Sequence, residues 1–238
     1  MNLGRGTVIA RRSVSLTKSY PIIGVFLTMA GLGVASIAGL TGAVPVSPGS
    51  LGQGGAGVAE AVPFIAVPLQ ALAAILFSTP VLLLFVYDKN NGVLEYLLSL
   101  GMDQGDIYRQ YLQAALMLAA GIVTFDVAVD AVAGVLLGFP VLMIELAGLA
   151  VALGLAAVAF GSLLMMSFSS LQKQRVGSNQ PLGMAIGTSL VLPSYIAPFV
   201  FPKVAMTLDL GLAGIAGCLA VATYLASSRL VSREKLLP

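Results

Sequence analysis

The feature that most constrains this chain is a succession of apolar runs, each long enough to cross a lipid bilayer. They cover residues 20–44, 61–86, 107–137, 141–168, 182–201 and 208–226, and a helix needs roughly 20 residues to cross the hydrocarbon core. Transmembrane strands would instead show alternation of polar and apolar residues. Only 9% of the residues are charged, against about 25% in ordinary soluble domains. We therefore expect an all-α integral membrane protein with six transmembrane helices, forming a single domain over residues 1–238.

The basic residues indicate how these spans are oriented. Six crossings place both chain ends on one side, and every basic residue except Lys203 falls on that side: Arg5, Arg11, Arg12, Lys18, Lys89, Arg109, Lys173, Arg175, Arg229, Arg233 and Lys235. Cytoplasmic loops carry an excess of Lys and Arg. We expect a multi-pass protein of the cell membrane with both termini in the cytoplasm. The net charge of +2, without a basic stripe, argues against a nucleic-acid partner.

Residues 1–19 mix apolar and basic side chains and contain no helix breaker between Gly6 and Pro21. In a helix, one face would carry Ile9, Ser13 and Leu16, and another Arg11, Arg12 and Lys18. This pattern is typical of an interfacial helix that lies on the membrane surface and whose cations meet anionic headgroups. The alternative is a disordered basic tail that only enforces the orientation.

The segment 88–106, between the second and third spans, is polar and carries its own short helix. The Asn-Asn-Gly sequence at 90–92 ends the second span, residues 93–100 form one or two helical turns, and Gly101 suits a left-handed cap. The apolar stripe of this short helix is expected on Val93, Leu97 and Leu100.

Two acidic residues then start the next helix. Asp103 can accept hydrogen bonds from its first amides, and Asp106 supports its positive N-terminal end. The expected product is a corner in which residues 98–102 project furthest into the cytoplasm. Such a corner can pass the push of a bound partner to two spans as a rigid-body motion. A surface hairpin without a partner fits the periodicity equally well.

Acidic residues within the apolar runs are the other polar feature. Asp126 and Asp130 in the third span are four positions apart and share a helix face, and Glu145 lies near the start of the fourth. Charges in hydrocarbon are costly and mark ion or substrate pathways. These acids either line a route for a cationic or polar substrate, or relay protons, or lie in an outer vestibule where the third span has left the bilayer.

The outer connections contain helix breakers. Residues 45–57 are rich in Gly, Pro and Ser, which predicts a flexible spacer. Residues 192–202 contain three prolines, each of which removes a backbone donor. We expect a broken or re-entrant helix before the sixth span, the alternative being a kinked helix end with interfacial aromatic residues.

Small residues recur at four-residue spacing in two spans, which allows close helix approach. They are Gly31, Ala35 and Gly39 in the first span, and Gly214, Cys218 and Ala222 in the sixth. Packing within one subunit is favoured over a dimer seam for both sets.

The pattern Lys89-x2-Gly92-x-Leu94-Glu95-x-Leu97-Leu98-Ser99-Leu100-Gly101-Met102-x3-Asp106-Ile107, between spans two and three of six, resembles the permease subunits of type-2 ATP-binding-cassette exporters. The resemblance implies that segment 88–106 is the coupling helix that docks on a separate ATPase subunit. The docking residues it implies are Glu95, Leu97, Leu98, Ser99, Leu100, Gly101 and Met102. It also implies that residues 1–19 form the connecting helix and that a second permease copy, or a related permease, completes the transporter.

The chain carries no Gly-x4-Gly-Lys-Ser/Thr phosphate-binding loop, so we expect ATP and Mg²⁺ on the partner and no enzymatic activity here. Histidine is absent and Cys218 is the only cysteine, so we expect neither a catalytic constellation nor a metal site or cofactor in this chain. Two alternatives remain: an ion-coupled secondary carrier that uses Asp126, Asp130 and Glu145, and a non-transporting membrane scaffold. The cargo stays open among lipid, peptide, drug and ion.

Overall fold

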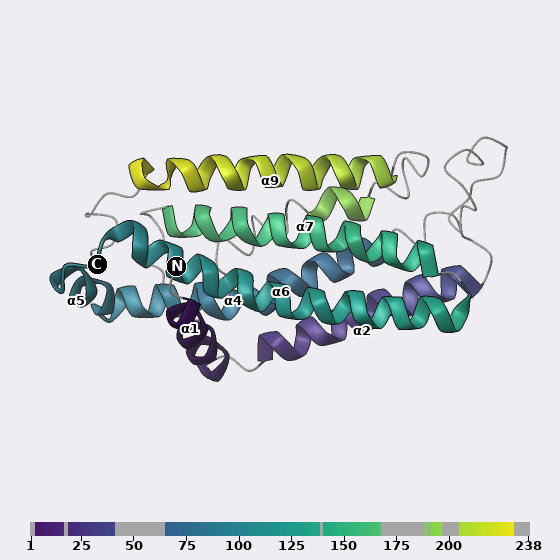
Figure 1. The fold of residues 1–238 in the computed structure, drawn as a ribbon, viewed down its shortest axis with the longest axis horizontal. Coiled ribbons are helices and arrows are strands. Elements are labelled where there is room, and N and C mark those ends of the chain that lie inside the picture. The colour runs from purple at the N-terminus through teal and green to yellow at the C-terminus, as the bar shows by residue number, and fades with distance from the viewer. Residues whose placement is uncertain are drawn as a thin grey trace.

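The computed structural model describes residues 3–16, 19–40, 65–138, 140–167, 189, 191–196 and 205–230, and every regular element among them is a helix. The helices are α1 (Leu3–Leu16), α2 (Ser19–Leu40), α4 (Ala66–Asn90), α5 (Val93–Ser99), α6 (Gln104–Leu137), α7 (Pro140–Ser167) and α9 (Ala205–Leu230), with a short helical segment at 191–196. The helices α2, α4, α6, α7 and α9 run along a common long axis (Figure 1). One end of this bundle carries α5, and we call it the α5 end and the opposite one the far end.

Three described helices are long and apolar enough to cross a membrane: Ala66–Asn90, Gln104–Leu137 and Met143–Leu163. They correspond to the second, third and fourth predicted spans and have similar boundaries. Shorter apolar stretches, Ile22–Ile37 and Thr207–Ala222, lie in α2 and α9. Helices satisfy their own backbone hydrogen bonds, as a segment in hydrocarbon requires. The prediction of a helical membrane protein is confirmed at this level.

Two predicted features of the outer connections lie largely outside the described residues. The spacer at 45–57 lies wholly outside them. Of the fifth span at 182–201 and the broken or re-entrant helix expected at 192–202, only 189 and 191–196 are described. Helix α7 runs towards the α5 end, whereas α9 begins at the far end (Figure 1). Within the proline-containing segment, Ser194 donates a hydrogen bond of 2.5 Å to Asp209 of α9. The segment 191–196 therefore packs beside the start of the last helix.

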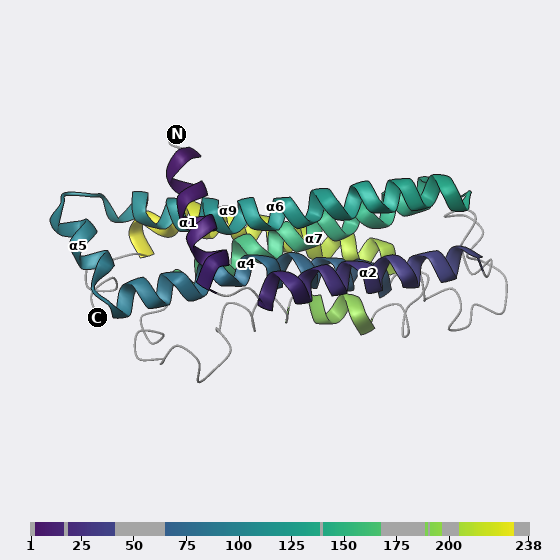
Figure 2. The ribbon, with the colours of Figure 1, turned by 90° about the horizontal axis from the view of Figure 1, so that it is seen from below.

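Helix α1 runs across the bundle axis rather than along it (Figure 2). It packs against α4 and α6, burying Ala10 and Ser13, while Arg11 and Arg12 are exposed. Of the helix predicted for residues 1–19, the part Leu3–Leu16 is therefore present, and its orientation relative to the long helices is the one an interfacial helix would have.

Small residues allow the long helices to approach closely. An added Cβ on Gly31 of α2 would lie 3.0 Å from the Gln70 side chain and 3.3 Å from the Ala66 carbonyl oxygen, both on α4. On α7, a Cβ on Gly154 would lie 3.0 Å from Ala74 Cβ, again on α4. Gly31 and Ala35 are both buried, so the described part of the small-residue face of α2 packs within the subunit, as predicted.

For α9, the prediction that its small-residue face packs within the subunit is not met among the described residues. A Cβ on Gly214 would meet nothing within 4 Å, and Cys218 and Ala222 are exposed. The reason is that α9 packs on α7 and buries Ala216 and Ala220, which lie two positions away from this stripe and hence on the other side of the helix.

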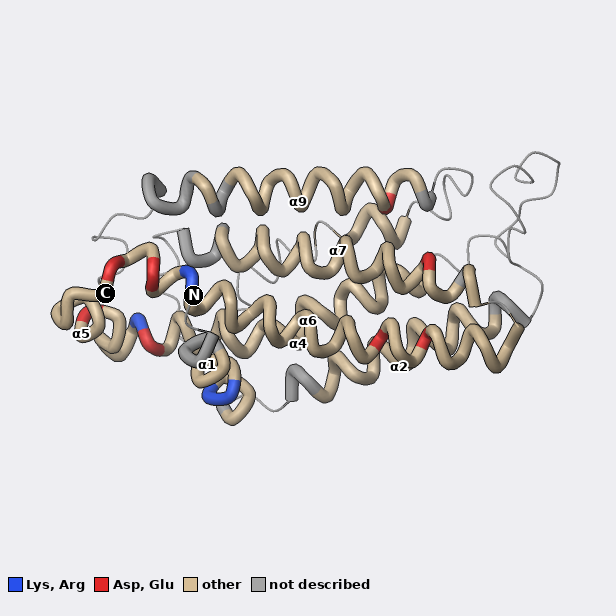
Figure 3. Tube along the Cα trace, viewed as in Figure 1, with Lys and Arg blue, Asp and Glu red and all other residues tan. Residues whose placement is uncertain are grey.

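Charge is segregated along the bundle. In Figure 3 the Lys and Arg residues of the described part lie towards the α5 end, the described acidic residues lie towards both ends, and the described middle of the bundle carries neither. Two polar clusters join α4 to α6, one near each end. The near cluster contains Arg12, Asp88 and Tyr111, and the far cluster contains Thr28, Gln70, Asp126 and Asp130.

Candidate functional site

The turns that enclose α5 use the residues that the sequence indicated. Helix α4 ends at Asn90, and Gly92 and Gly101 adopt left-handed φ values of 70° and 81° on either side of α5. Asp103 then caps α6, its side chain accepting a 3.0 Å hydrogen bond from the Gly105 amide. We call residues 91–103 the corner. The predicted helix, left-handed glycine and cap are all confirmed.

The two faces of α5 differ sharply in burial. Leu94 and Leu98 are buried against the bundle. On the outward side, Tyr96 is 61% exposed and Leu100, in the turn after α5, is 62% exposed. The predicted stripe of Val93, Leu97 and Leu100 is therefore shifted: the buried positions are Leu94 and Leu98, and the helix ends at Ser99, before Leu100.

The predicted docking residues consequently divide into three groups. Exposed are Glu95, Ser99, Leu100 and Gly101, half-buried are Leu97 and Met102, and buried is Leu98. Leu98, expected to project outward, instead supports the corner from within. The sequence interpretation also omitted Tyr96, although its position two residues from both Leu94 and Leu98 places it on the opposite face.

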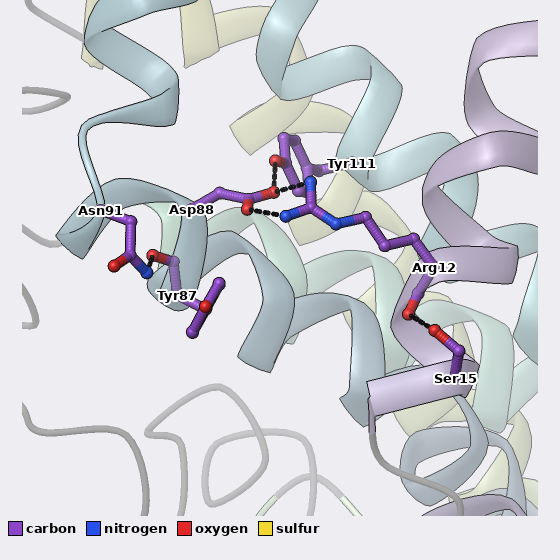
Figure 4. A network of polar contacts seen from close by, with 6 residues as sticks. All are labelled: Arg12, Ser15, Tyr87, Asp88, Asn91 and Tyr111. Atoms are coloured by element: carbon purple, nitrogen blue, oxygen red, sulfur yellow. Dashed lines mark hydrogen bonds and ion pairs between the residues drawn. The ribbon is translucent and has the colours of Figure 1, made fainter.

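The near cluster fixes the base of the corner (Figure 4). Arg12 Nη2 of α1 lies 3.0 Å from Asp88 Oδ1 of α4, and the Tyr111 hydroxyl of α6 donates a 2.6 Å hydrogen bond to Asp88 Oδ2. Because Asp88 is buried, these two partners, rather than water, stabilise its negative charge. One carboxylate thus links the transverse helix to both helices that carry the corner.

Aromatic packing and a cavity complete this region. The ring of Phe85 meets Tyr108 and Tyr111 edge-on at centroid distances of 5.7 and 5.2 Å, a favourable geometry that joins α4 to α6. A cavity of about 300 Å³ lies between α1, α5 and α6, with Ile9 and Leu97 among its lining residues. The base of the corner is therefore well packed on α4 and α6, whereas space remains between α5 and α1.

The structure brings together two of the three acids predicted to line a pathway. Asp126 and Asp130 are each 2% exposed and lie on the buried face of α6. Gln70 of α4 donates a 2.6 Å hydrogen bond to Asp130, a partner the sequence did not reveal. Glu145 is exposed on α7. Among the described residues, no group of three or more His, Cys, Asp or Glu side chains is arranged to hold a metal ion.

No family model, curated protein or solved structure matches this chain. Its function is therefore inferred from the geometry of the corner and from the sequence pattern that forms it. Both concern the same residues, because the left-handed glycines of the pattern are the ones that set α5 across the bundle end.

Proposed function

We propose that this chain is the membrane-spanning permease subunit of an ATP-driven exporter. The corner couples this subunit to a separate ATPase subunit. The observation that carries the proposal is the exposure of Tyr96 and Leu100 at the tip of the bundle, beside buried Leu94 and Leu98. A helix braced from within while it presents apolar side chains outward has the form of a docking element, since aromatic residues are enriched at interfaces.

The fold supports a mechanical role for this element. The corner is continuous with α4 and α6, and the near cluster ties both of them to α1. A partner that displaces α5 would therefore move two membrane-crossing helices together, as a rigid-body motion, and pull on the transverse helix. ATP hydrolysis on the partner would thus move α4 and α6 from the α5 end of the bundle.

The orientation and span count belong to the same proposal. The described Lys and Arg side chains lie towards the α5 end (Figure 3). They belong to α1, to the last turn of α4 and to the first turns of α6, and the positive-inside rule assigns that end to the cytoplasm. With a fifth span at 182–201, six crossings place both termini in the cytoplasm of a cell-membrane protein. A second permease copy would complete the pathway.

Replacing Leu100 by aspartate is expected to abolish co-purification of the ATPase from the native host, together with the Mg-ATP hydrolysis of the purified complex. The reason is that a charge would replace an apolar side chain at the centre of the contact. Because Leu100 is exposed, the melting temperature of the permease should stay unchanged. Leu98→Asp is a poorer test, since it would place a carboxylate in the core.

Asn90→Asp is the matched control, because it adds the same charge at an exposed position next to the corner. This variant should keep both the ATPase and its activity. The proposal fails if no ATPase with a phosphate-binding loop accompanies the parent chain, or if Leu100→Asp retains it fully.

The sidedness can be measured with single cysteines, because Cys218 is the only native one. In a Cys218→Ser background, Ser99→Cys should resist a membrane-impermeant maleimide in intact cells and react after permeabilisation. Val141→Cys, exposed near the far end, should react without permeabilisation. The reverse labelling pattern would place the corner outside the cell and exclude an ATPase partner there.

The far cluster favours one alternative function, an ion-coupled carrier. Two buried acids one helical turn apart are the kind of group such carriers use. Transport by the purified chain alone in vesicles, driven by an ion gradient without ATP and abolished in Asp126→Asn, would establish this alternative. Under the leading proposal, transport instead requires the ATPase and Mg-ATP.

A further inference from the structure

The far cluster gathers polar side chains from three helices. Asp126 and Asp130 lie one turn apart on α6. Gln70 of α4 bonds to Asp130. The Thr28 side chain of α2, whose hydroxyl donates to the Gly24 carbonyl oxygen, lies beside Asp126. All four residues are at least 98% buried. Two carboxylates, one amide and one hydroxyl thus share a site closed off from solvent by the described helices.

Three oxygen atoms of this cluster accept no hydrogen bond within the part of the chain that the structure describes. They are Gln70 Oε1, Asp126 Oδ1 and Asp130 Oδ1. Buried polar atoms nearly always have a partner, and each exception requires a physical explanation. Gln70 carries particular weight here, because its amide nitrogen is bonded to Asp130 and its unpaired oxygen belongs to the same amide group beside the acids.

Basic side chains of the described residues are too distant to compensate these acids. Arg109 precedes Asp126 by seventeen positions on the same helix, which corresponds to about 25 Å. Lys89 lies at the α5 end of α4, nineteen positions from Gln70. Burying two carboxylates without a positive charge is strongly unfavourable. The site therefore combines unpaired acceptor oxygens with negative charge, and no basic side chain of the described residues lies near it.

We propose that Thr28, Gln70, Asp126 and Asp130 form a binding site for one hard cation, with Ca²⁺ the charge-matched ligand. Carboxylate and amide oxygens are the ligands that Ca²⁺ takes, in flexible geometry. Mg²⁺ fits less well, because it keeps several waters and demands near-octahedral geometry. Without His or Cys, the site disfavours transition metals. The bound cation would hold α2, α4 and α6 together at the far end, independently of whether an ATPase drives the chain.

The test is equilibrium binding of radioactive ⁴⁵Ca²⁺ to the purified full-length chain after chelator treatment, paired with thermal unfolding. We expect saturable binding of one Ca²⁺ per chain and a melting temperature that rises with the logarithm of Ca²⁺ concentration above Kd. Mg²⁺ at equal ionic strength should give little shift. Na⁺ in place of Ca²⁺ tests the same oxygen atoms with a cation of half the charge. If Na⁺ raises the melting temperature in a saturable way, and Asp130→Asn removes this rise, the site holds a hard monovalent cation.

The variants locate the site. Asp130→Asn, nearly isosteric, should lose both the binding and the shift, whereas Glu145→Gln, which removes an exposed carboxylate from α7, should keep them. Absence of saturable binding of either cation to the parent chain overturns the proposal, whatever the folding of the variants. Binding that survives Asp130→Asn, or that disappears in Glu145→Gln, also overturns it. The ATPase assay of Leu100→Asp is unaffected by either result, so the two proposals fail separately.

Discussion

Gly154→Leu is expected to lower the melting temperature of the purified chain by several degrees. A Cβ added at this position would lie 3.0 Å from Ala74 Cβ and 3.3 Å from Ala71 Cα, so the remaining carbons of leucine have no space between α7 and α4. Overpacking of a close-packed core typically costs about 1–3 kcal/mol. The measurement is thermal unfolding in detergent, followed by loss of helical circular dichroism or by aggregation.

Gly148→Leu on the same helix is the matched control. Gly148 is exposed, and a Cβ there would meet nothing within 4 Å. Both substitutions remove a helical glycine, which by itself favours the helix by up to about 1 kcal/mol, so the difference between the variants isolates the steric term. Equal melting temperatures for the two variants would show that α7 does not pack on α4 as described.

Arg12→Ala is expected to destabilise the chain more than Asp88→Ala does. The Arg12 side chain is 47% exposed and the Asp88 side chain only 2%. Removing the arginine leaves a buried carboxylate with Tyr111 as its remaining partner, whereas removing the aspartate leaves a cation that reaches solvent. Loss of one partner of a buried pair costs about 3–5 kcal/mol, and partial exposure of Arg12 favours the lower end. Unfolding free energies of both variants and of the double variant test this order.

The double variant should resemble Asp88→Ala, because the unpaired carboxylate is gone in both. Arg11→Ala serves as the control, since Arg11 is the adjacent exposed cation on α1. If Arg11→Ala loses as much unfolding free energy as Arg12→Ala, the cause is a general effect of charge at the membrane surface. A larger loss of unfolding free energy in Asp88→Ala than in Arg12→Ala would contradict the expected order of the two variants.

Features encoded within a few residues could be predicted from the sequence. Apolar run length located the described long helices, and Gly92, Gly101 and Asp103 located the turns around α5. These signals depend on local backbone chemistry, which needs no knowledge of tertiary packing. Long-range partners carry no such signal: Arg12 and Asp88 are 76 positions apart, and Gln70 and Asp130 are 60 apart.

The face of α5 illustrates a further limit. In two turns of helix, Val93 with Leu97 and Leu94 with Leu98 are equally spaced apolar pairs, so periodicity alone does not decide which one is buried. The decision comes from the direction in which the chain leaves α4 through the left-handed Gly92. Tyr96 was therefore missed as an exposed residue, and Leu98 was placed on the wrong side.

The spacing of the two polar clusters has a consequence for the membrane in which this chain resides. Asp88 and Gln70 are eighteen positions apart on α4, or about 27 Å, and Tyr111 and Asp130 are nineteen apart on α6, or about 28 Å. This span matches the roughly 30 Å of hydrocarbon in an ordinary bilayer. In a markedly thicker bilayer, one of the two clusters would lie among the acyl chains. The thickness of the bilayer should therefore affect the tilt of α4 and α6 and the lipids that the protein prefers.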